Sequence, residues 1–229
     1  MDMKARAGKD TSTVKWVKVW DGPVRLFHWS LVLLIIGAYV SARQGKLDVH
    51  FYIGYAILTL VLFRILWGIA GSQTARFSQF VKSPMAALSH LGHVLRRQRE
   101  DEAGHNAAGA YMVLALLALV LFQTISGLFS NDGMFEEAPL AHLVGGAWSD
   151  TLTMLHGYSF DIIVIAVVLH VAAVLLYAVL LRQDLVRPMV TGWTRLPARL
   201  AAPHLAPLWL AALLLLVAAG AVWGVVNYA

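Results

Sequence analysis

The sequence predicts an all-α membrane protein with five transmembrane helices, and two features of the chain support this. Of its 229 residues, 59% are hydrophobic and only 14% are charged, whereas a soluble domain has about a quarter charged residues. The hydrophobic residues also form continuous runs instead of alternating as they do in membrane strands. A helix needs about 20 consecutive apolar residues to cross the bilayer core. The segments that reach or approach this length are residues 24–40, 51–70, 108–129, 162–181 and 207–226.

The segment before the first span, residues 1–23, is polar and basic. It has neither the short apolar core nor the small-residue cleavage site of a signal peptide, so we expect the first span to be retained as a helix. The sequence contains no cysteine. Disulfides, thiolate-bound iron–sulfur clusters and haem attached through Cys-x-x-Cys-His are therefore excluded. A redox cofactor would have to be held by histidine, methionine or carboxylate.

Lysine and arginine are distributed unevenly among the segments between the spans. With the amino terminus placed inside the cell, all but three of the 18 Lys and Arg residues fall on inner segments. The exceptions are Arg43 and Lys46 in the first outer loop and Arg64 within the second span. Because positive residues are retained on the cytoplasmic side during insertion, we expect a cytoplasmic amino terminus and, after five spans, a carboxyl terminus outside. The net charge of +5 follows from this topology, and no nucleic-acid partner is predicted.

The inner loop of residues 71–104 predicts a short helix. Ser83 followed by Pro84 is a common helix start, and apolar residues then recur on one face of the helix. These residues are Met85, Leu88, Leu91 and Leu95. We expect the helix to lie on the membrane surface, with Arg96, Arg97 and Arg99 facing anionic lipid headgroups.

The outer loop of residues 130–149 is acidic, with Asp132, Glu136 and Glu137. It is interpreted either as a docking surface for a water-soluble partner or as a solvated loop. A linker containing Gly and Pro, residues 191–206, precedes the fifth span. That span has no histidine and contains Gly220-x-x-x-Gly224, a spacing that lets helices approach closely. It predicts either an accessory helix that forms a homodimer or ordinary helix packing.

Four of the nine histidines lie at or within the spans: His28, His50, His156 and His170. Ionisable groups at membrane depth are costly and usually mark a functional site. In a helix, the separation of His156 and His170 corresponds to about 21 Å of rise and about 40° of rotation. One helix therefore presents two imidazoles on one face, one near each side of the membrane. His50 enters from the outer side and faces His156, and His28 enters from the inner side and pairs with His170.

Two imidazole pairs at different depths predict two non-covalently bound haems b. His28 and His170 are the predicted ligands of an inner haem iron, and His50 and His156 are those of an outer one. Zinc is disfavoured because it gathers three or four protein ligands, and neither pair has a carboxylate cluster beside it. The predicted fold is thus a four-helix transmembrane haem-binding bundle plus a fifth transmembrane helix. Its parts are a cytoplasmic basic segment (1–23), the cytochrome core (24–190), a cytoplasmic linker (191–206) and an accessory transmembrane helix (207–229).

Arg64 and His105 are two further candidate site residues. Arg64 follows His50 by the same spacing that separates the two span-four histidines, so it lies on the same helix face as His50, toward the inner side. A buried guanidinium needs an anion, and we interpret Arg64 as the partner of a propionate of the inner haem, with snorkelling to the interface as the alternative. His105 is a candidate for binding a quinone headgroup, with haem ligation or capping of the third span as alternatives. The remaining histidines, His90, His93, His142 and His204, are expected to be solvated.

Several motifs together resemble one family. They are Lys18-Val19-Trp20-Asp21, Arg25-Leu26-Phe27-His28-Trp29, His50-Phe51-Tyr52-Ile53-Gly54-Tyr55, Phe63-Arg64-Ile65-Leu66-Trp67-Gly68, Gly104-His105-Asn106 and the pair His156 and His170. Over residues 15–188 they resemble the bacterial cytochrome b561 and nickel–iron hydrogenase b-type cytochrome family. The resemblance implies a four-helix bundle with two haems b, ligated by the four histidines as paired above. The fifth span departs from that four-helix pattern.

The resemblance also implies a function in the bacterial inner membrane. Electrons would pass between the quinone pool and a periplasmic partner such as a c-type cytochrome or a hydrogenase-like enzyme. Basic c-type cytochromes would be steered to the acidic outer loop. Within the same fold, the alternative is a superoxide:quinone oxidoreductase, for which only Arg43 and Lys46 would supply an outer basic funnel. From another class, the alternative is a haem-free transporter or assembly subunit, but the repeated halves and broken helices common in transporters are not evident.

Overall fold

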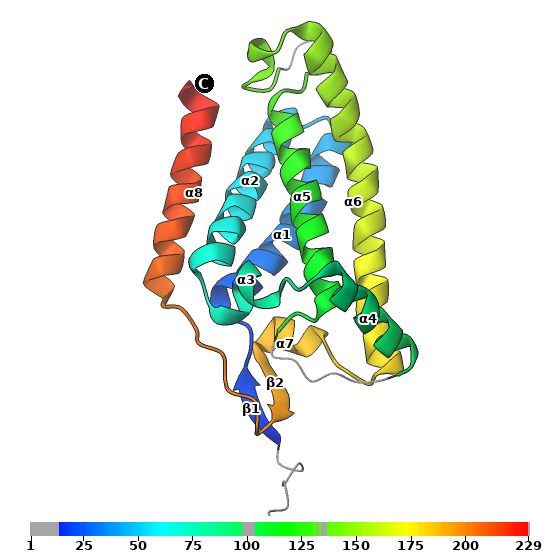
Figure 1. Cartoon of the computed structure of the whole chain (residues 1–229). Coiled ribbons are helices and arrows are strands. Elements are labelled where there is room, and N and C mark those ends of the chain that lie inside the picture. Colours follow the sequence, from blue (N-terminus) through cyan, green and yellow to red (C-terminus); the bar gives the residue numbers. More distant parts are fainter. Residues whose placement is uncertain (1–13, 98–103, 132, 134–136, 229) are drawn as a thin grey trace, which may run out of the picture.

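The computed structural model describes residues 14–97, 104–131, 133 and 137–228. Five of its helices are long and apolar enough to cross a membrane (Figure 1). They are α1 (Gly22–Arg43), α2 (Leu47–Ala70), α5 (Ala107–Leu128), α6 (Gly146–Leu180) and α8 (Leu208–Tyr228). The prediction of an all-α membrane protein with five spans is therefore confirmed.

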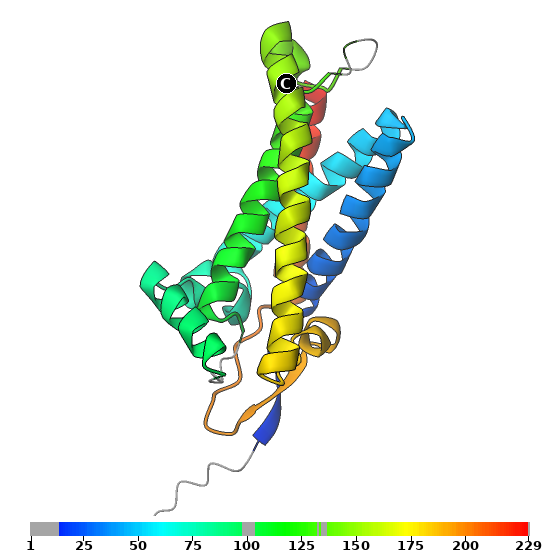
Figure 2. The same ribbon diagram turned by 90° about the vertical axis from the view of Figure 1, so that its right-hand side faces the viewer.

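The central helix of the bundle is α2. It packs against α1, α5 and α8, while α6 packs against α5. Figure 1 shows α8 at the edge of the bundle beside α2, and Figure 2 shows the α1–α2 hairpin inclined to the α5–α6 pair. The first four spans thus form one bundle, and the fifth, α8, packs against α2 at the edge of that bundle.

Helix α6 is much longer than the predicted fourth span. Its 35 residues correspond to about 52 Å of rise, against a hydrocarbon core of about 30 Å. The polar residues Ser159 and Asp161 interrupt the apolar run, so hydropathy placed the start of the span at residue 162. The helix in fact begins at Gly146, and His156 lies within it.

Three helices begin with a side-chain cap. Asp21 precedes α1 and accepts a hydrogen bond from the Val24 amide at 2.7 Å, with Pro23 in the first turn. Asn106 caps α5 by accepting from the Gly109 amide at 2.7 Å. Ser83 caps α4 (Pro84–Leu95), which confirms the helix start predicted from Ser83 and Pro84. Such caps satisfy amides that have no partner within the helix.

A two-stranded antiparallel sheet lies at one end of the bundle, which we call the sheet end (Figure 1). Strand β1 (Val14–Lys18) pairs with β2 (Trp193–Pro197), with Lys18 opposite Trp193. Arg187 and Arg195 lie over the Trp16 ring, with their guanidinium carbons 4.6 and 4.9 Å from its centroid. The sequence pattern predicted no strand here. The pairing joins the basic segment to the linker, and residues 1–13 of that segment lie outside the described residues.

Short helical elements complete the chain. At the sheet end these are η1 (Gln73–Ala75), α3 (Phe77–Phe80), α4 and α7 (Val186–Thr191), and at the opposite end η2 (Ala141–Leu143). On α4, Met85 and Leu88 are exposed, as expected for a face turned to a membrane surface. Arg99, also expected to face lipid headgroups, lies outside the described residues.

The expectation that His90 is solvated is wrong. His90 is buried, and its Nε2 lies 2.7 Å from the Tyr177 hydroxyl near the end of α6. The opposite face of α4 therefore packs on the protein, through Ala87, His90 and Val94. The apolar residues of α4 predict which face contacts lipid, but they do not predict that a polar residue on the other face is buried.

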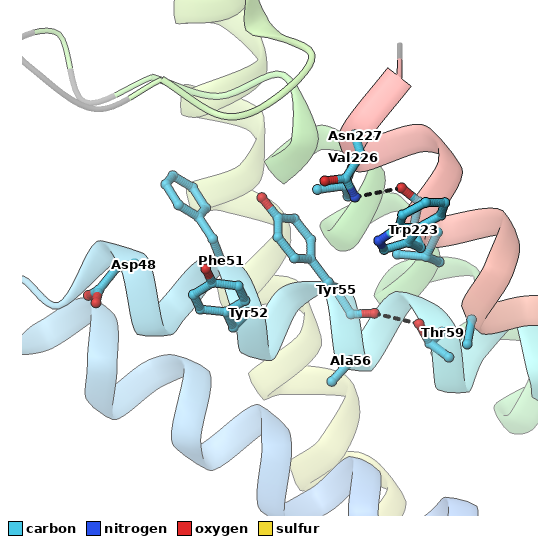
Figure 3. A pocket seen from close by; sticks show the side chains of 11 residues that line it. Asp48, Phe51, Tyr52, Tyr55, Ala56, Thr59, Trp223, Val226 and Asn227 are labelled. Atoms are coloured by element: carbon cyan, nitrogen blue, oxygen red, sulfur yellow. Dashed lines mark hydrogen bonds between the residues drawn. The ribbon is translucent and has the colours of Figure 1, made fainter.

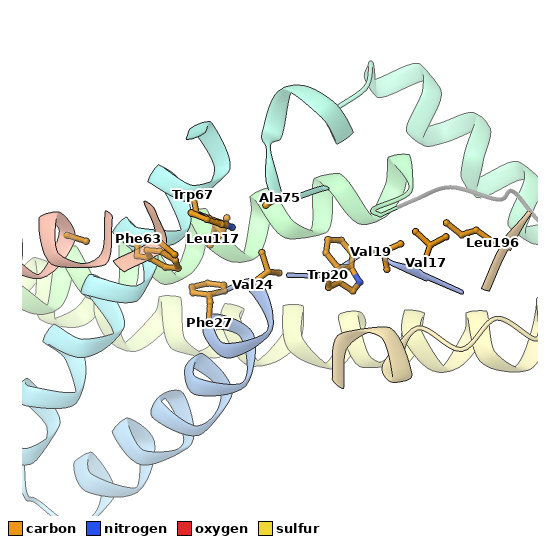
Figure 4. Close-up of a cluster of buried hydrophobic side chains, with 12 residues drawn as sticks. Val17, Val19, Trp20, Val24, Phe27, Phe63, Trp67, Ala75, Leu117 and Leu196 are labelled. Carbon is orange, nitrogen blue, oxygen red and sulfur yellow. The ribbon is translucent and has the colours of Figure 1, made fainter. Parts of the chain in front are cut away.

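The largest cluster of buried hydrophobic residues lies toward the sheet end (Figure 4). It contains Trp20 between β1 and α1, Phe27 of α1, Phe63 and Trp67 of α2, and Leu196 of β2. Burial of such aromatic side chains contributes a large part of the hydrophobic stabilisation. This cluster fixes the ends of α1 and α2 against the sheet and so positions the buried polar residues that lie beside it.

Candidate functional site

His50 of α2 and His156 of α6 face each other near the end of the bundle opposite the sheet. Their ring centroids are 6.1 Å apart and their planes are inclined by 82°. A metal about 2 Å from a nitrogen of each ring would hold the ring centres about 6 Å apart. The spacing of the two imidazoles therefore fits one metal ion between them.

Hydrogen bonds orient both rings for that role. The His50 Nδ1 lies 2.9 Å from the Ala38 carbonyl oxygen, and the His156 Nδ1 lies 2.8 Å from that of Gln123. An imidazole that donates its Nδ1–H to a carbonyl leaves Nε2 unprotonated and free to ligate a metal. The Gln123 amide nitrogen lies 3.0 Å from the His156 Nε2, so this amide would move aside when a metal binds.

Gly127 of α5 provides space for the His156 ring. A Cβ atom at Gly127 would lie 2.9 Å from the His156 Cε1 and 3.1 Å from its Nδ1. Gly127→Ala is therefore expected to tilt the ring away from Gln123 and to weaken cofactor binding by roughly 10-fold, the scale typical of lost ligand orientation. The measurement is haem content and redox titration of the purified variant. Gly157→Ala is the matched control, because a Cβ there meets no atom within 4 Å, and equal behaviour of the two variants would contradict this role.

His28 of α1 and His170 of α6 form the second predicted pair, nearer the sheet end. The His170 ring acts electrostatically on His28. The His28 Nδ1 is buried and has no hydrogen-bond partner among the described residues, and the ring packs edge-on against Trp29 with centroids 4.9 Å apart. A buried nitrogen without a partner is costly, and it fits a site whose polar groups are completed by a bound group.

His105 lies just before α5, which begins at the sheet end of the bundle (Figure 1). Its ring packs between Trp20 and Phe80, with both centroid distances 4.6 Å, and its Nδ1 is buried without a hydrogen-bond partner in the part of the chain that the structure describes. Burial lowers the pKa of His105 to about 3, with smaller contributions from Arg64 and His170, so the ring is neutral at pH 7. The alternative that His105 caps α5 is wrong, because the cap is Asn106.

Arg64 is buried in α2, with 2% of its surface exposed. Its Nη1 donates a hydrogen bond to the Ala75 carbonyl at 3.2 Å, and its guanidinium carbon lies 5.2 Å from the centroid of the Phe77 ring. The side chain therefore does not snorkel to the interface. The charge of Asp21 also acts on it, as expected for a buried cation that needs an anion.

Asp21 is buried, and in the sequence it was identified only as part of a motif, with no predicted role. Its Oδ2 accepts a hydrogen bond from the Trp67 indole at 2.9 Å, while its Oδ1 caps α1. An Asp just before Gly22-Pro23 is a helix-start signal, and this signal could have identified the cap. Nothing local in the sequence indicates Trp67 or Arg64 as its partners.

Within the described part of the chain, no group of three or more His, Asp or Glu side chains could hold a metal ion. The two histidine pairs therefore suit a metal whose other ligands come from its own cofactor. Haem meets this requirement, because the porphyrin supplies the in-plane ligands and two axial imidazoles complete the iron. The residues present fit haem, and the spacing of His50 and His156 suits one iron between the two rings.

The acidic loop of residues 130–149 is described only in part. Glu137 and Asp150 are exposed, and Asp150 accepts a hydrogen bond from the side-chain amide of Asn131 at 3.0 Å. Asp132 and Glu136, which belong to the same prediction, lie outside the described residues. Arg43 and Lys46 are exposed at the turn between α1 and α2.

Comparisons with known proteins place the chain in one family of membrane cytochromes. The profile of the family described as prokaryotic cytochrome b561 matches residues 19–192. The chain is 28% identical over 218 residues to the probable Ni/Fe-hydrogenase B-type cytochrome subunit of Azotobacter chroococcum, covering 77% of this chain and 88% of the relative. The protein of the same name from Cupriavidus necator is 23% identical over 221 residues, covering 79% and 88%. No solved structure gives a significant match. The matched range contains all six predicted site residues and ends before α8.

Proposed function

The chain belongs to the prokaryotic cytochrome b561 family and is therefore a multi-pass membrane b-type cytochrome that transfers electrons. We propose that it binds two haems b and lies in the bacterial inner membrane. In this proposal, electrons pass between the quinone pool and a periplasmic redox partner. The observation that carries it is the facing pair His50 and His156, with a centroid distance that suits one iron and with both Nδ1 atoms bonded to carbonyl oxygens.

The proposed ligands are His50 and His156 for the outer haem and His28 and His170 for the inner one. Haem supplies one-electron redox chemistry, and the chain holds and orients it. The two histidines of α6 set the depths of the two sites, about 21 Å apart along one helix. A rigid helix that carries one ligand of each haem keeps the distance between the two centres constant.

Arg64 is proposed to bind a propionate of the inner haem. Its burial, its contact with Phe77 and its anchoring to Ala75 hold the guanidinium at the sheet end of α2. Guanidinium groups bind carboxylates through charge-assisted hydrogen bonds. Asp21 would compete for the same charge, so we propose that the two anions share it.

The orientation and partner are proposed from charge and from the relatives. The sheet end carries exposed or half-exposed basic residues of the inner segments, which include Lys15, Arg187 and Arg195. This end is proposed to be cytoplasmic. The relatives are named as subunits of Ni/Fe hydrogenases, and a hydrogenase-like enzyme or a c-type cytochrome is proposed to dock outside, beside Glu137 and Asp150.

The test is spectroscopic and uses the purified full-length protein. We expect two haems per polypeptide by pyridine haemochrome assay and a b-type difference spectrum on reduction. Anaerobic addition of a short-chain quinol should reduce haem, and a soluble basic c-type cytochrome should then be reduced in turn. A colourless protein would contradict the haem sites, one haem per chain would contradict the second site, and haem inert to quinol and quinone would contradict the quinone partner.

A further inference from the structure

A pocket of about 610 Å³ lies between α2 and α8, near the end of the bundle opposite the sheet (Figure 3). Its walls are mainly aromatic, from Phe51, Tyr52 and Tyr55 on α2 and Trp223 on α8. Asp48 and Asn227 add polar groups. The volume is within the range typical of small-molecule sites, about 300–1,000 Å³.

We propose that this pocket binds the ring of a membrane quinone or quinol beside the outer haem. The proposal rests on the proposed function and names where that function meets its lipid-soluble substrate. The family profile ends at residue 192, whereas one wall of the pocket is α8. One wall of the site therefore lies outside the matched range, and the proposal gives the fifth span a function.

The lining matches the chemistry of a quinone ring, which is flat and apolar with two carbonyl oxygens that accept hydrogen bonds. The Tyr52 and Tyr55 rings lie edge to face with centroids 6.2 Å apart, an arrangement that offers aromatic surface to a flat ligand. Thr59 and Asn227 already donate to backbone oxygens of their own helices, each at 2.8 Å. The Tyr52 and Tyr55 hydroxyls form no hydrogen bond with the described part of the chain and remain available as donors.

The pocket lies on the same turns of α2 as the proposed outer haem ligand. Phe51 follows His50 directly, so the ring of His50 faces α6 while its neighbours line the pocket toward α8. The two sites are thus separated by about one helix diameter, roughly 10 Å. In the oxidising direction, a quinol would give two electrons, one at a time, to ferric iron and two protons through Asp48 to water, leaving the quinone.

Two other occupants fit the pocket less well. A phospholipid headgroup would call for Lys or Arg at its phosphate, but no cationic residue lines the pocket, and Asp48 would repel the phosphate. A second copy of the chain would use the small residues of α8, Gly220 and Gly224, since a Cβ at either meets nothing within 4 Å. Neither glycine lines the pocket. Tyr52 and Trp223 are more than half exposed, which leaves the pocket open for an isoprenoid tail.

The test is photolabelling of the purified, haem-containing protein with an azido-quinone, mapped by mass spectrometry. We expect the label on α2 between residues 48 and 59 or on α8 between residues 219 and 227. Tyr55→Trp, which fills the pocket, should reduce labelling at least tenfold, and Tyr55→Phe should reduce it less. Haem content should be unchanged in both. Tyr158→Phe, at an exposed tyrosine of α6, is the matched control and should label like the parent.

Three results would overturn the site. Label concentrated near His105 and lost in His105→Phe would move the quinone to the sheet end and leave the proposed function intact. Absence of label, with two haems still reduced by quinol, would also exclude this pocket but keep the function. Native mass spectrometry that finds a phospholipid retained in the parent and released by Tyr55→Trp would assign the pocket to lipid. Failure of the proposed function itself would appear separately, as missing haem or as haem inert to quinol.

Discussion

Replacing His156 with leucine is expected to yield a folded protein that retains one haem per chain instead of two. The reason is that haem b has no covalent link to the chain and depends on its axial ligands, and the His156 ring faces His50 at 6.1 Å with its Nδ1 fixed by Gln123. Leucine fills the volume but offers no nitrogen. Haem content by pyridine haemochrome assay and the number of components in a redox titration are the measurements. His142→Ala, at an exposed histidine in η2, is the control and should retain both haems.

The same measurement on other variants tests the pairing. His50→Leu should remove the same redox component as His156→Leu, whereas His28→Leu and His170→Leu should remove the other. If His28→Leu and His156→Leu lost the same component, the pairing would be wrong. Loss of the inner component in His105→Leu, together with its retention in His28→Leu, would make His105 the ligand. Its buried Nδ1, which has no hydrogen-bond partner among the described residues, and the electrostatic effect of His170 on it make this the alternative to test.

Replacing Asp21 with alanine is expected to lower the free energy of unfolding by about 3–5 kcal/mol, the cost of leaving a buried charge without its partner. The carboxylate caps α1, accepts from the Trp67 indole and balances Arg64, and all three partners lie at the sheet end. Asp21→Asn keeps an oxygen for the cap but removes the charge, so it should recover only part of the loss. Thermal unfolding in detergent, followed by the haem absorption band, is the measurement.

Ser83→Ala provides the control for Asp21, because Ser83 is an exposed cap of α4 with no buried charge to balance. Its loss should cost about 1 kcal/mol. If Asp21→Ala were no more destabilising than Ser83→Ala, the buried contact of Asp21 with Arg64 would contribute nothing measurable to stability.

The spans and the histidine pattern could be predicted because both depend on local features of the sequence. Hydropathy identifies a membrane helix from its composition, and a fixed helical rise converts the His156–His170 spacing into depth. The ends of the spans were less accurate. Asp48 and His50 lie within the first turns of α2, and α6 continues well beyond its apolar run to Gly146, because a helix does not end where polarity begins.

Features that depend on contacts between distant segments could not be predicted. The β1–β2 pairing joins segments at opposite ends of the cytochrome core, and neither strand has a pattern that distinguishes it from a loop. The bond between His90 and Tyr177 and the contact between Asp21 and Trp67 are of the same kind. The pocket between α2 and α8 likewise required knowledge of which face of α2 the fifth span covers.

The length of α6 constrains how a partner can exchange electrons with this protein. The ten residues from Gly146 to His156 raise the tip of the helix about 15 Å above the proposed outer iron. Because electron-tunnelling rates fall exponentially with distance, a carrier that docks on the end of α6 would exchange electrons slowly with this iron. Rapid exchange therefore requires a carrier docked beside Glu137 and Asp150 to lie along the side of α6 and not on its end. The protruding end of α6 then directs the soluble carrier to the side of the helix, where it can approach the proposed outer iron more closely.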